Sequence, residues 1–161
     1  MKTDFDAIRD LYRFNSRVRR KYLNAIWRLP PRQRYRDRGA SYPSLVDIYM
    51  HVLDAYRWWF LSVYGDGKPV DEYPLGKRYT KSEARKETTI VERLIEKTLR
   101  EIGPRGLNRS VSWKGRRPFT VSTRMMLIHM IEEELQHRGE LNALLWQLDI
   151  DPPVTGFDDP P

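Results

Sequence analysis

Apolar side chains recur at intervals of three and four residues along four segments of the chain, which is the spacing of amphipathic helices with one buried face. The first segment begins after Thr3, a residue suited to cap a helix, and ends at Pro30 and Pro31, which cannot continue one. The arginine-rich residues 32–43 are then expected to form a loop. The buried face of this first helix is predicted to consist of Ile8, Leu11, Asn15, Val18, Tyr22, Ala25 and Leu29.

A second helix is predicted from about Leu45 to Tyr64, where the sequence "GDGKP" ends the pattern. Ser41 or Ser44 is suited to cap its start, because a serine hydroxyl can accept a hydrogen bond from an amide of the first helical turn. The stretch from this helix to the next is long enough to cross from one end of a helical bundle to the other. The inward positions of the second helix are predicted to be Leu45, Ile48, Val52, Ala55 and Trp59.

The third helix follows the sequence "TKSE", in which Thr80 and Glu83 are placed to form a reciprocal capping box, and it is predicted to end at Gly103. Farther along, "VSW" and "FTV" alternate apolar and polar residues on either side of "KGRRP". Alternation with a period of two around a glycine turn predicts a short hairpin or an extended crossover.

The last helix is predicted from near Thr123 to Leu148. Gly139 lies inside it at a cost of about 1 kcal/mol relative to alanine, which suggests that another backbone packs closely there. Four helices without an internal repeat predict an all-α fold: an up-and-down four-helix bundle with a long crossover and a short hairpin before the last helix. The chain, residues 1–161, is expected to form this one domain.

The composition excludes chemistry that needs a cysteine of the protein and predicts that the chain does not span a membrane. The chain has no cysteine, so any thiol chemistry would have to use the thiol of a substrate. Charged residues are scattered from the start, and no apolar run approaches the roughly 18 residues of a membrane-spanning helix. We therefore expect a soluble cytoplasmic protein without a membrane partner.

The net charge of +7 is concentrated near the start of the chain. Residues 1–40 hold 12 of the 29 Lys and Arg residues but only 4 of the 22 Asp and Glu residues. These arginines, including Arg17, Arg19 and Arg20, are expected to lie on a solvated helix face and loop. No base-reading motif accompanies them, so specific nucleic-acid binding is not expected, although the patch would suit an acidic partner.

The sequence "HMIEEELQHRGEL", residues 129–141, places imidazole and carboxylate side chains in the last helix. Glu133 and His137 are four residues apart, so they share the helix face that carries the apolar stripe. A carboxylate placed in a core needs a partner, and a divalent cation is one. His51 faces the same core from the second helix, and histidine is the commonest metal ligand. We therefore predict that His51, Glu133 and His137 bind one divalent metal ion.

Two further polar residues are candidates for a supporting or substrate-facing role, and for His129 the role of a hydrogen-bonded core histidine is an equal alternative. His129 also lies four residues from Glu133, but it is about 12 Å from His137 along the helix axis, too far to share an ion with it. Asn15 interrupts the apolar stripe of the first helix, where its amide could bond substrate or a metal-bound water, or satisfy a backbone carbonyl. No residue is assigned as a catalytic acid or base.

Three segments of the chain resemble the DinB-like family. The sequence "LIHMIEEELQHRGELNALLWQLDIDPP" resembles the closing helix of that family, whose hallmark ends in HRGQ. The sequences "LYRFNSRVRRKYLNAIWRLPP" and "SLVDIYMHVLDAYRWWF" resemble its first and second helices. The resemblance implies a metal held by one histidine of the second helix and two of the last, spaced HxxxH. His51 and His137 match two of these positions, and Glu133 stands in place of the middle histidine.

The resemblance also implies a metal-dependent enzyme, because relatives include transferases that use low-molecular-weight thiols as cosubstrates. A metal with open positions lowers the pKa of a bound water or thiol, so the expected activity is of the hydrolase or thiol-transferase type. Two histidines and one carboxylate suit zinc, iron, nickel or manganese. The family further implies a homodimer. The alternative is a non-catalytic, metal-stabilised binding module or dimer that uses its basic patch.

Overall fold

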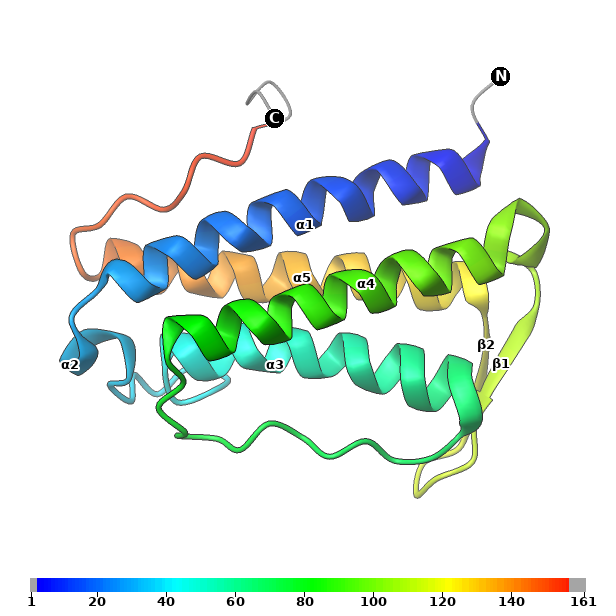
Figure 1. The fold of residues 1–161 in the computed structure, drawn as a ribbon, viewed down its shortest axis with the longest axis horizontal. Helices are drawn as coiled ribbons and strands as arrows, with labels where there is room; N and C mark the ends of the chain where they lie inside the picture. Colours follow the sequence, from blue (N-terminus) through cyan, green and yellow to red (C-terminus); the bar gives the residue numbers. More distant parts are fainter. Residues whose placement is uncertain (1–2, 157–161) are drawn as a thin grey trace.

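The computed structural model describes residues 3–156, which are predominantly helical (Figure 1). The long helices lie side by side, and α4 runs parallel to α3 because residues 67–80 return along the length of the molecule before α4 begins. The predicted helical fold with a long crossover is thus present in outline. The long elements are α1 (Asp4–Arg28), α3 (Leu45–Arg57) with its π-helical continuation η1 (Trp58–Asp66), α4 (Lys81–Gly106) and α5 (Thr123–Trp146).

The predicted helix caps are present. The Thr3 side chain accepts a hydrogen bond from the amide of Asp6 to begin α1. The hydroxyl of Ser44, the second of the two serines considered, caps α3. At the start of α4, the Thr80 hydroxyl accepts from the Glu83 amide and the Glu83 carboxylate accepts from the Thr80 amide. These bonds satisfy amide groups that a helix start otherwise leaves unpaired, so the local sequence fixes where the helices begin.

The segment predicted to be a loop contains a short helix, α2 (Pro31–Arg34). Proline is favoured at the first position of a helix, so Pro31 both ends α1 and begins α2. The Arg34 guanidinium donates to the backbone oxygens of Trp27 and Leu29 at the end of α1. This arginine therefore caps a helix end rather than extending into solvent.

The second helix changes its hydrogen-bonding pattern at Trp58 instead of remaining an α-helix to Tyr64. The wider π turns of η1 end at Gly67, whose φ of 75° suits glycine. Trp58 and Trp59, which are consecutive, are both half-buried and line one cavity. The π segment therefore lies next to a cavity, a common position for such segments.

The predicted hairpin is confirmed: strands β1 (Ser110–Trp113) and β2 (Phe119–Ser122) pair antiparallel. Gly115 lies in its turn, where a Cβ atom would come within 2.4 Å of the Trp113 ring. Only glycine lets the indole fold back over the turn in this way. The Trp113 ring in turn packs 5.3 Å from that of Trp58, so the hairpin extends the aromatic cluster at the end of α3 and η1.

Three other expectations need correction. The helix predicted to end at Gly103 continues to Gly106 after a kink, where Gly103 has a φ of 55°. Gly139 is exposed, and a Cβ atom there would meet nothing within 4 Å, so no backbone among residues 3–156 packs against it. Arg19, placed on a solvated face by the charge pattern, is only 3% exposed.

The chain after α5 runs over the surface, as expected. The Lys21 ammonium on α1 donates to the backbone oxygen of Val154. Residues 157–161 of the predicted tail lie outside the described residues. Within residues 3–156, no helix has an apolar stretch long enough to cross a bilayer.

Candidate metal centre

Helices α3 and α5 pack against each other and bring the three predicted ligands together. The Glu133 Oε1 atom lies 3.1 Å from Nε2 of His51 and 3.2 Å from Nε2 of His137. All three potential ligand atoms lie within 4.8 Å of one another. Ligand atoms around a tetrahedral ion with bonds of about 2.1 Å are roughly 3.4 Å apart, so this arrangement fits a metal ion after small adjustments.

His137 is oriented by a second carboxylate. Its Nδ1 atom lies 3.1 Å from Oε2 of Glu140. Glu140 is itself held by the backbone amide of Ser41 at 2.7 Å and the Ser41 hydroxyl at 2.6 Å. Because a carboxylate can only accept, this contact is a hydrogen bond in the tautomer that carries its proton on Nδ1 of His137. This is the arrangement in which a carboxylate fixes the tautomer of a metal-binding histidine.

That tautomer leaves the lone pair of His137 Nε2 directed at Oε1 of Glu133. Two acceptors at 3.2 Å repel each other unless the imidazole takes a second proton or a cation lies between them. Burial alone would raise the pKa of Glu133, but the neighbouring His51 and His137 side chains outweigh this effect and lower the pKa. Glu133 is therefore an anion beside a ring nitrogen, which favours a cation at this point.

His51 is held by an aromatic neighbour that the sequence did not suggest. The Tyr42 ring stacks on the His51 ring with centroids 3.9 Å apart, and the Tyr42 hydroxyl lies 3.1 Å from Nε2. Burial is the largest effect on His51 and lowers its pKa. The ring is thus kept in the neutral form that binds metals.

A cavity of about 320 Å³ is lined by two of the three candidate ligands, His51 and Glu133. His129, a candidate for a supporting or substrate-facing role, lines it, and its ring lies 5.0 Å from that of Trp59. Asn15 does not line it, because its Oδ1 atom accepts a hydrogen bond from the Arg138 guanidinium in the core. The other walls are formed by Tyr42, Asp47, Met50, His51, Asp54, Ala55, Trp58, Val70, Glu72, Tyr73, Pro74, Leu75 and Glu133.

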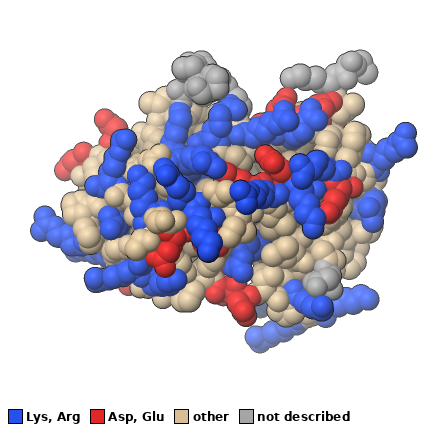
Figure 2. All heavy atoms as spheres, viewed as in Figure 1, with Lys and Arg blue, Asp and Glu red and all other residues tan. Residues whose placement is uncertain are grey.

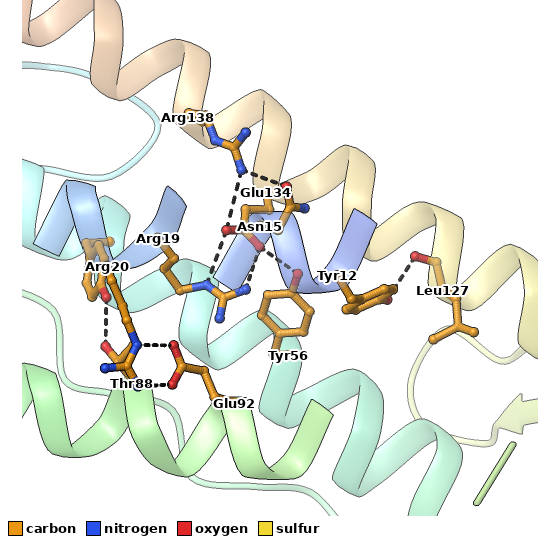
Figure 3. Close-up of polar contacts among 11 residues, drawn as sticks. Tyr12, Asn15, Arg19, Arg20, Tyr56, Thr88, Glu92, Leu127, Glu134 and Arg138 are labelled. Carbon is orange, nitrogen blue, oxygen red and sulfur yellow. Dashed lines mark hydrogen bonds and ion pairs between the residues drawn. The ribbon is translucent and has the colours of Figure 1, made fainter. Parts of the chain in front are cut away.

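The consecutive glutamates of α5 point in three directions. Glu132 is exposed, Glu133 belongs to the candidate metal centre, and Glu134 is buried on the side that faces α1 (Figure 3). Glu134 accepts from Arg19 through Nε at 3.2 Å and Nη2 at 2.7 Å, and from the Tyr56 hydroxyl at 2.6 Å. The sequence contained one signal for this pair, since Arg19 lies four residues after Asn15 and so on the same helix face.

The sequence was also compared with models of protein families. A sequence model of the DinB family matches residues 1–159. The chain belongs to the DinB family. The resemblance first seen in three helices of this DinB chain is thereby confirmed over nearly its whole length. No curated protein matches the chain significantly.

Replacing Glu140 of this DinB-family protein with glutamine is expected to weaken divalent metal binding by about 10–100-fold, because a neutral amide accepts more weakly than a carboxylate and can also turn an N–H group toward His137. Competition with a chromophoric chelator measures the affinity. Glu132→Gln is the matched control, since Glu132 is an exposed glutamate of the same helix. Equal affinities for the two variants would show that Glu140 does not support the site.

Proposed function

We propose that this DinB-family protein is a metal-dependent enzyme of the hydrolase or thiol-transferase type, built on a four-helix bundle in which a long crossover makes α3 and α4 parallel rather than up-and-down neighbours (Figure 1). His51, Glu133 and His137 would hold one divalent ion, and substrate would bind in the adjoining cavity. The observation that carries the proposal is the convergence of the three ligand atoms beside a cavity of about 320 Å³. When bound, the ion supplies a Lewis acid that lowers the pKa of a water or thiol, giving a nucleophile at neutral pH.

The exposure of the ligands favours a catalytic site over a structural one. His137 is buried, but the side chains of His51 and Glu133 each remain 22% exposed. Structural metal sites in proteins are closed by four protein ligands, whereas catalytic sites keep a position open to substrate. Among the described residues, only three side chains of the ligand types converge here, which leaves such a position toward the cavity.

The negative charge of Glu133 affects which metal and which reaction the site supports. An anionic ligand in place of a neutral imidazole makes a bound ion a weaker Lewis acid. Two histidines and one carboxylate suit zinc with one open position and iron(II) with several, and nickel or manganese can also accept this set. The donor set therefore supports the divalent class without selecting one metal.

The cavity walls favour a neutral or cationic substrate group over an anionic one. Asp54 and Glu72 line the cavity together with Glu133, whereas no lysine or arginine of residues 3–156 does so. Trp58 and Trp59 supply aromatic surfaces that attract apolar groups and cations. His129 faces the same space and can exchange a proton with a bound substrate, because a histidine side chain both donates and accepts.

Two measurements on protein purified without a metal-affinity resin test this function. Metal analysis is expected to find one divalent ion per chain, and a chelator should lower the melting temperature because an ion that binds only the folded state stabilises it. In cobalt(II)-substituted protein, a small thiol should then change the visible spectrum by occupying the open position. A chain that takes up no zinc, nickel, iron or manganese would refute the metal site. A cobalt(II) spectrum that does not change when the thiol is added would refute binding of a thiol to the metal.

A second candidate function, a binding module for an acidic partner, is favoured by the basic face of the molecule. Lysine and arginine side chains cover much of the face shown in Figure 2, with acidic residues among them. Arg9, Arg13 and Arg17 follow one another at four-residue intervals along α1 and line a groove of about 760 Å³ against α4. Binding of a polyanion that weakens steeply with salt, and that persists after chelation, would support this function.

A further inference from the structure

Two consecutive residues of the segment between α2 and α3, Ser41 and Tyr42, reach both histidines of the candidate metal centre. Ser41 donates its backbone N–H and its hydroxyl to Glu140, which in turn lies 3.1 Å from Nδ1 of His137. Tyr42 stacks on His51, with ring centroids 3.9 Å apart and an angle of 20° between the ring planes. The segment is thus bound to α5 through Ser41 and to α3 through Tyr42, which fixes where the Tyr42 hydroxyl lies.

The Tyr42 hydroxyl lies beside the ring nitrogen of His51 that points at Glu133. Its oxygen is 3.1 Å from Nε2 of His51. Because the two rings are nearly parallel, the hydroxyl lies above the imidazole plane rather than in line with the Nε2 lone pair, which is in that plane. Nε2 can therefore bind a cation while the hydroxyl stays where it is. A bond from a metal ion to a histidine nitrogen is only about 2.1 Å long, so the hydroxyl borders the coordination positions of such an ion.

The proton of this hydroxyl has no other acceptor among residues 3–156. Nε2 of His51 has a single in-plane position, and Oε1 of Glu133 lies 3.1 Å away from it. A cation bound to Nε2 uses the lone pair of this nitrogen, so the phenol then has no acceptor on His51 either. Tyr42 is half-buried and lines the cavity of about 320 Å³. Its O–H group is therefore available to a molecule bound in that cavity.

We propose that Tyr42 contacts the substrate, by donating a hydrogen bond to the anionic atom that occupies the open position of the metal centre. This role rests on the metal-dependent function proposed above and adds a substrate-binding residue to it. The acceptor is the deprotonated oxygen or sulfur that attacks in a hydrolase or a thiol transferase. Hydrogen bonds to a charged acceptor are about twice as strong as those between neutral groups, so this one donor both holds and orients the anion.

The other walls of the cavity provide little else that attracts an anion. Among residues 3–156, the charged side chains that line it are all carboxylates, including Asp54 and Glu72. The second tyrosine of these walls, Tyr73, already donates its hydroxyl to Glu87 at 2.6 Å. An anionic atom is therefore favoured only where the metal centre and the Tyr42 hydroxyl meet, and the acidic walls face the neutral or cationic remainder of the substrate.

Azide binding to the cobalt(II)-substituted chain tests this role, because azide is a small anion that can occupy an open position and change the visible spectrum. Tyr42→Phe keeps the ring that stacks on His51 and removes only the hydroxyl. The affinity for cobalt is expected to be unchanged. The dissociation constant of azide should rise by about tenfold or more, since a hydrogen bond to a charged group is lost.

Tyr73→Phe is the matched control, because it removes a tyrosine hydroxyl from the same cavity that is bonded to Glu87 and not to a candidate ligand. Its affinities for cobalt and for azide should equal those of the parent. Tyr42→Ala also removes the stacked ring, so it should weaken cobalt binding by leaving His51 less well oriented. Comparing Tyr42→Phe with Tyr42→Ala separates the role of the hydroxyl from that of the ring, and circular dichroism confirms that all three variants fold.

Three results would overturn the role of Tyr42 while leaving the metal centre in place. The first is an azide affinity that is the same in Tyr42→Phe and Tyr73→Phe. The second is a Tyr42→Phe chain that folds but loses cobalt, which would make the hydroxyl itself a metal ligand. The third is a parent that binds cobalt but not azide, because its metal centre then has no position open to an anion. A parent that takes up no divalent metal would instead refute the proposed function, and the role of Tyr42 with it.

Discussion

Replacing Arg19 with methionine is expected to lower the free energy of unfolding by about 3–5 kcal/mol, because Glu134 loses its closest cationic partner while remaining buried in the core. Arg19 and Glu134 are 3% and 4% exposed and joined by two hydrogen bonds. Burial alone would lower the pKa of Arg19, but the charge of Glu134 raises it, so the arginine stays cationic. Burial raises the pKa of the Tyr56 hydroxyl well above its ordinary value. The hydroxyl therefore stays protonated and donates a hydrogen bond to Glu134.

The neighbouring pair of Arg20 and Glu92 is the matched control. It is also bonded through both nitrogens of one guanidinium fork, but the Arg20 side chain is 54% exposed. Solvent screens such a pair, so Arg20→Met should cost no more than about 1 kcal/mol. Urea unfolding with chelator present measures both variants without a contribution from bound metal. Equal losses for Arg19→Met and Arg20→Met would show that burial does not determine the effect.

A double variant measures the interaction between Arg19 and Glu134 separately from their contacts with other residues. Arg19→Met/Glu134→Leu removes both charges, so it should lose less stability than the sum of the single variants. The residual loss should not vanish, because Arg138 also lies 3.7 Å from Glu134 and bonds Asn15 (Figure 3). Additive losses would mean that the two side chains act independently despite their contact.

The buried pair also bears on the candidate metal centre. Glu134 follows Glu133 directly, so fixing Glu134 against α1 fixes the rotation of α5 about its axis. That rotation directs Glu133 and His137 toward His51 on α3. Arg19→Met is therefore expected to loosen the metal site as well as the core, without changing any of its ligands.

Local sequence patterns were sufficient to predict much of the fold. The capping residues Thr3 and Thr80 act on amides within one helical turn, so their roles can be read from short segments. The hairpin likewise depends on a few consecutive residues. The π segment after Trp58 was not predictable in this way, because it reflects the packing of Trp58 and Trp59 against the hairpin and α5.

The candidate site was predictable only in part. Helical periodicity alone placed His51, Glu133 and His137 on inward faces, where the structure brings them together. Tyr42 and Glu140 were missed, because their contacts with the histidines depend on where the segment before α3 lies in space. The burial of Arg19 and Glu134 was missed for a different reason. Charged residues are rarely buried unless they are paired, and the sequence alone does not show that these two side chains meet.

Replacing His137 with alanine removes a metal ligand, so it is expected to weaken metal binding more than Glu140→Gln does. Loss of the hydrogen-bond partner of a ligand costs roughly 10–100-fold in affinity. His137 is buried, so no water can take over its position without entering the core. His51→Ala should have a similar effect. Metal content after dialysis, and the shift of the melting temperature when chelator is added, measure the loss; a variant without metal should show no such shift.

Two further variants distinguish a metal centre from a polar cluster in the core. His129→Ala should retain the metal, because His129 lines the cavity but does not belong to the group of converging ligands. Glu133→His should also retain it, since three imidazoles form a complete set for a divalent ion. In a polar cluster without metal, Glu133→His would remove the carboxylate that both histidines contact and leave three imidazoles side by side. The free energy of unfolding should then fall. Metal-independent stability in the parent, with no loss in His137→Ala, would therefore refute the metal centre.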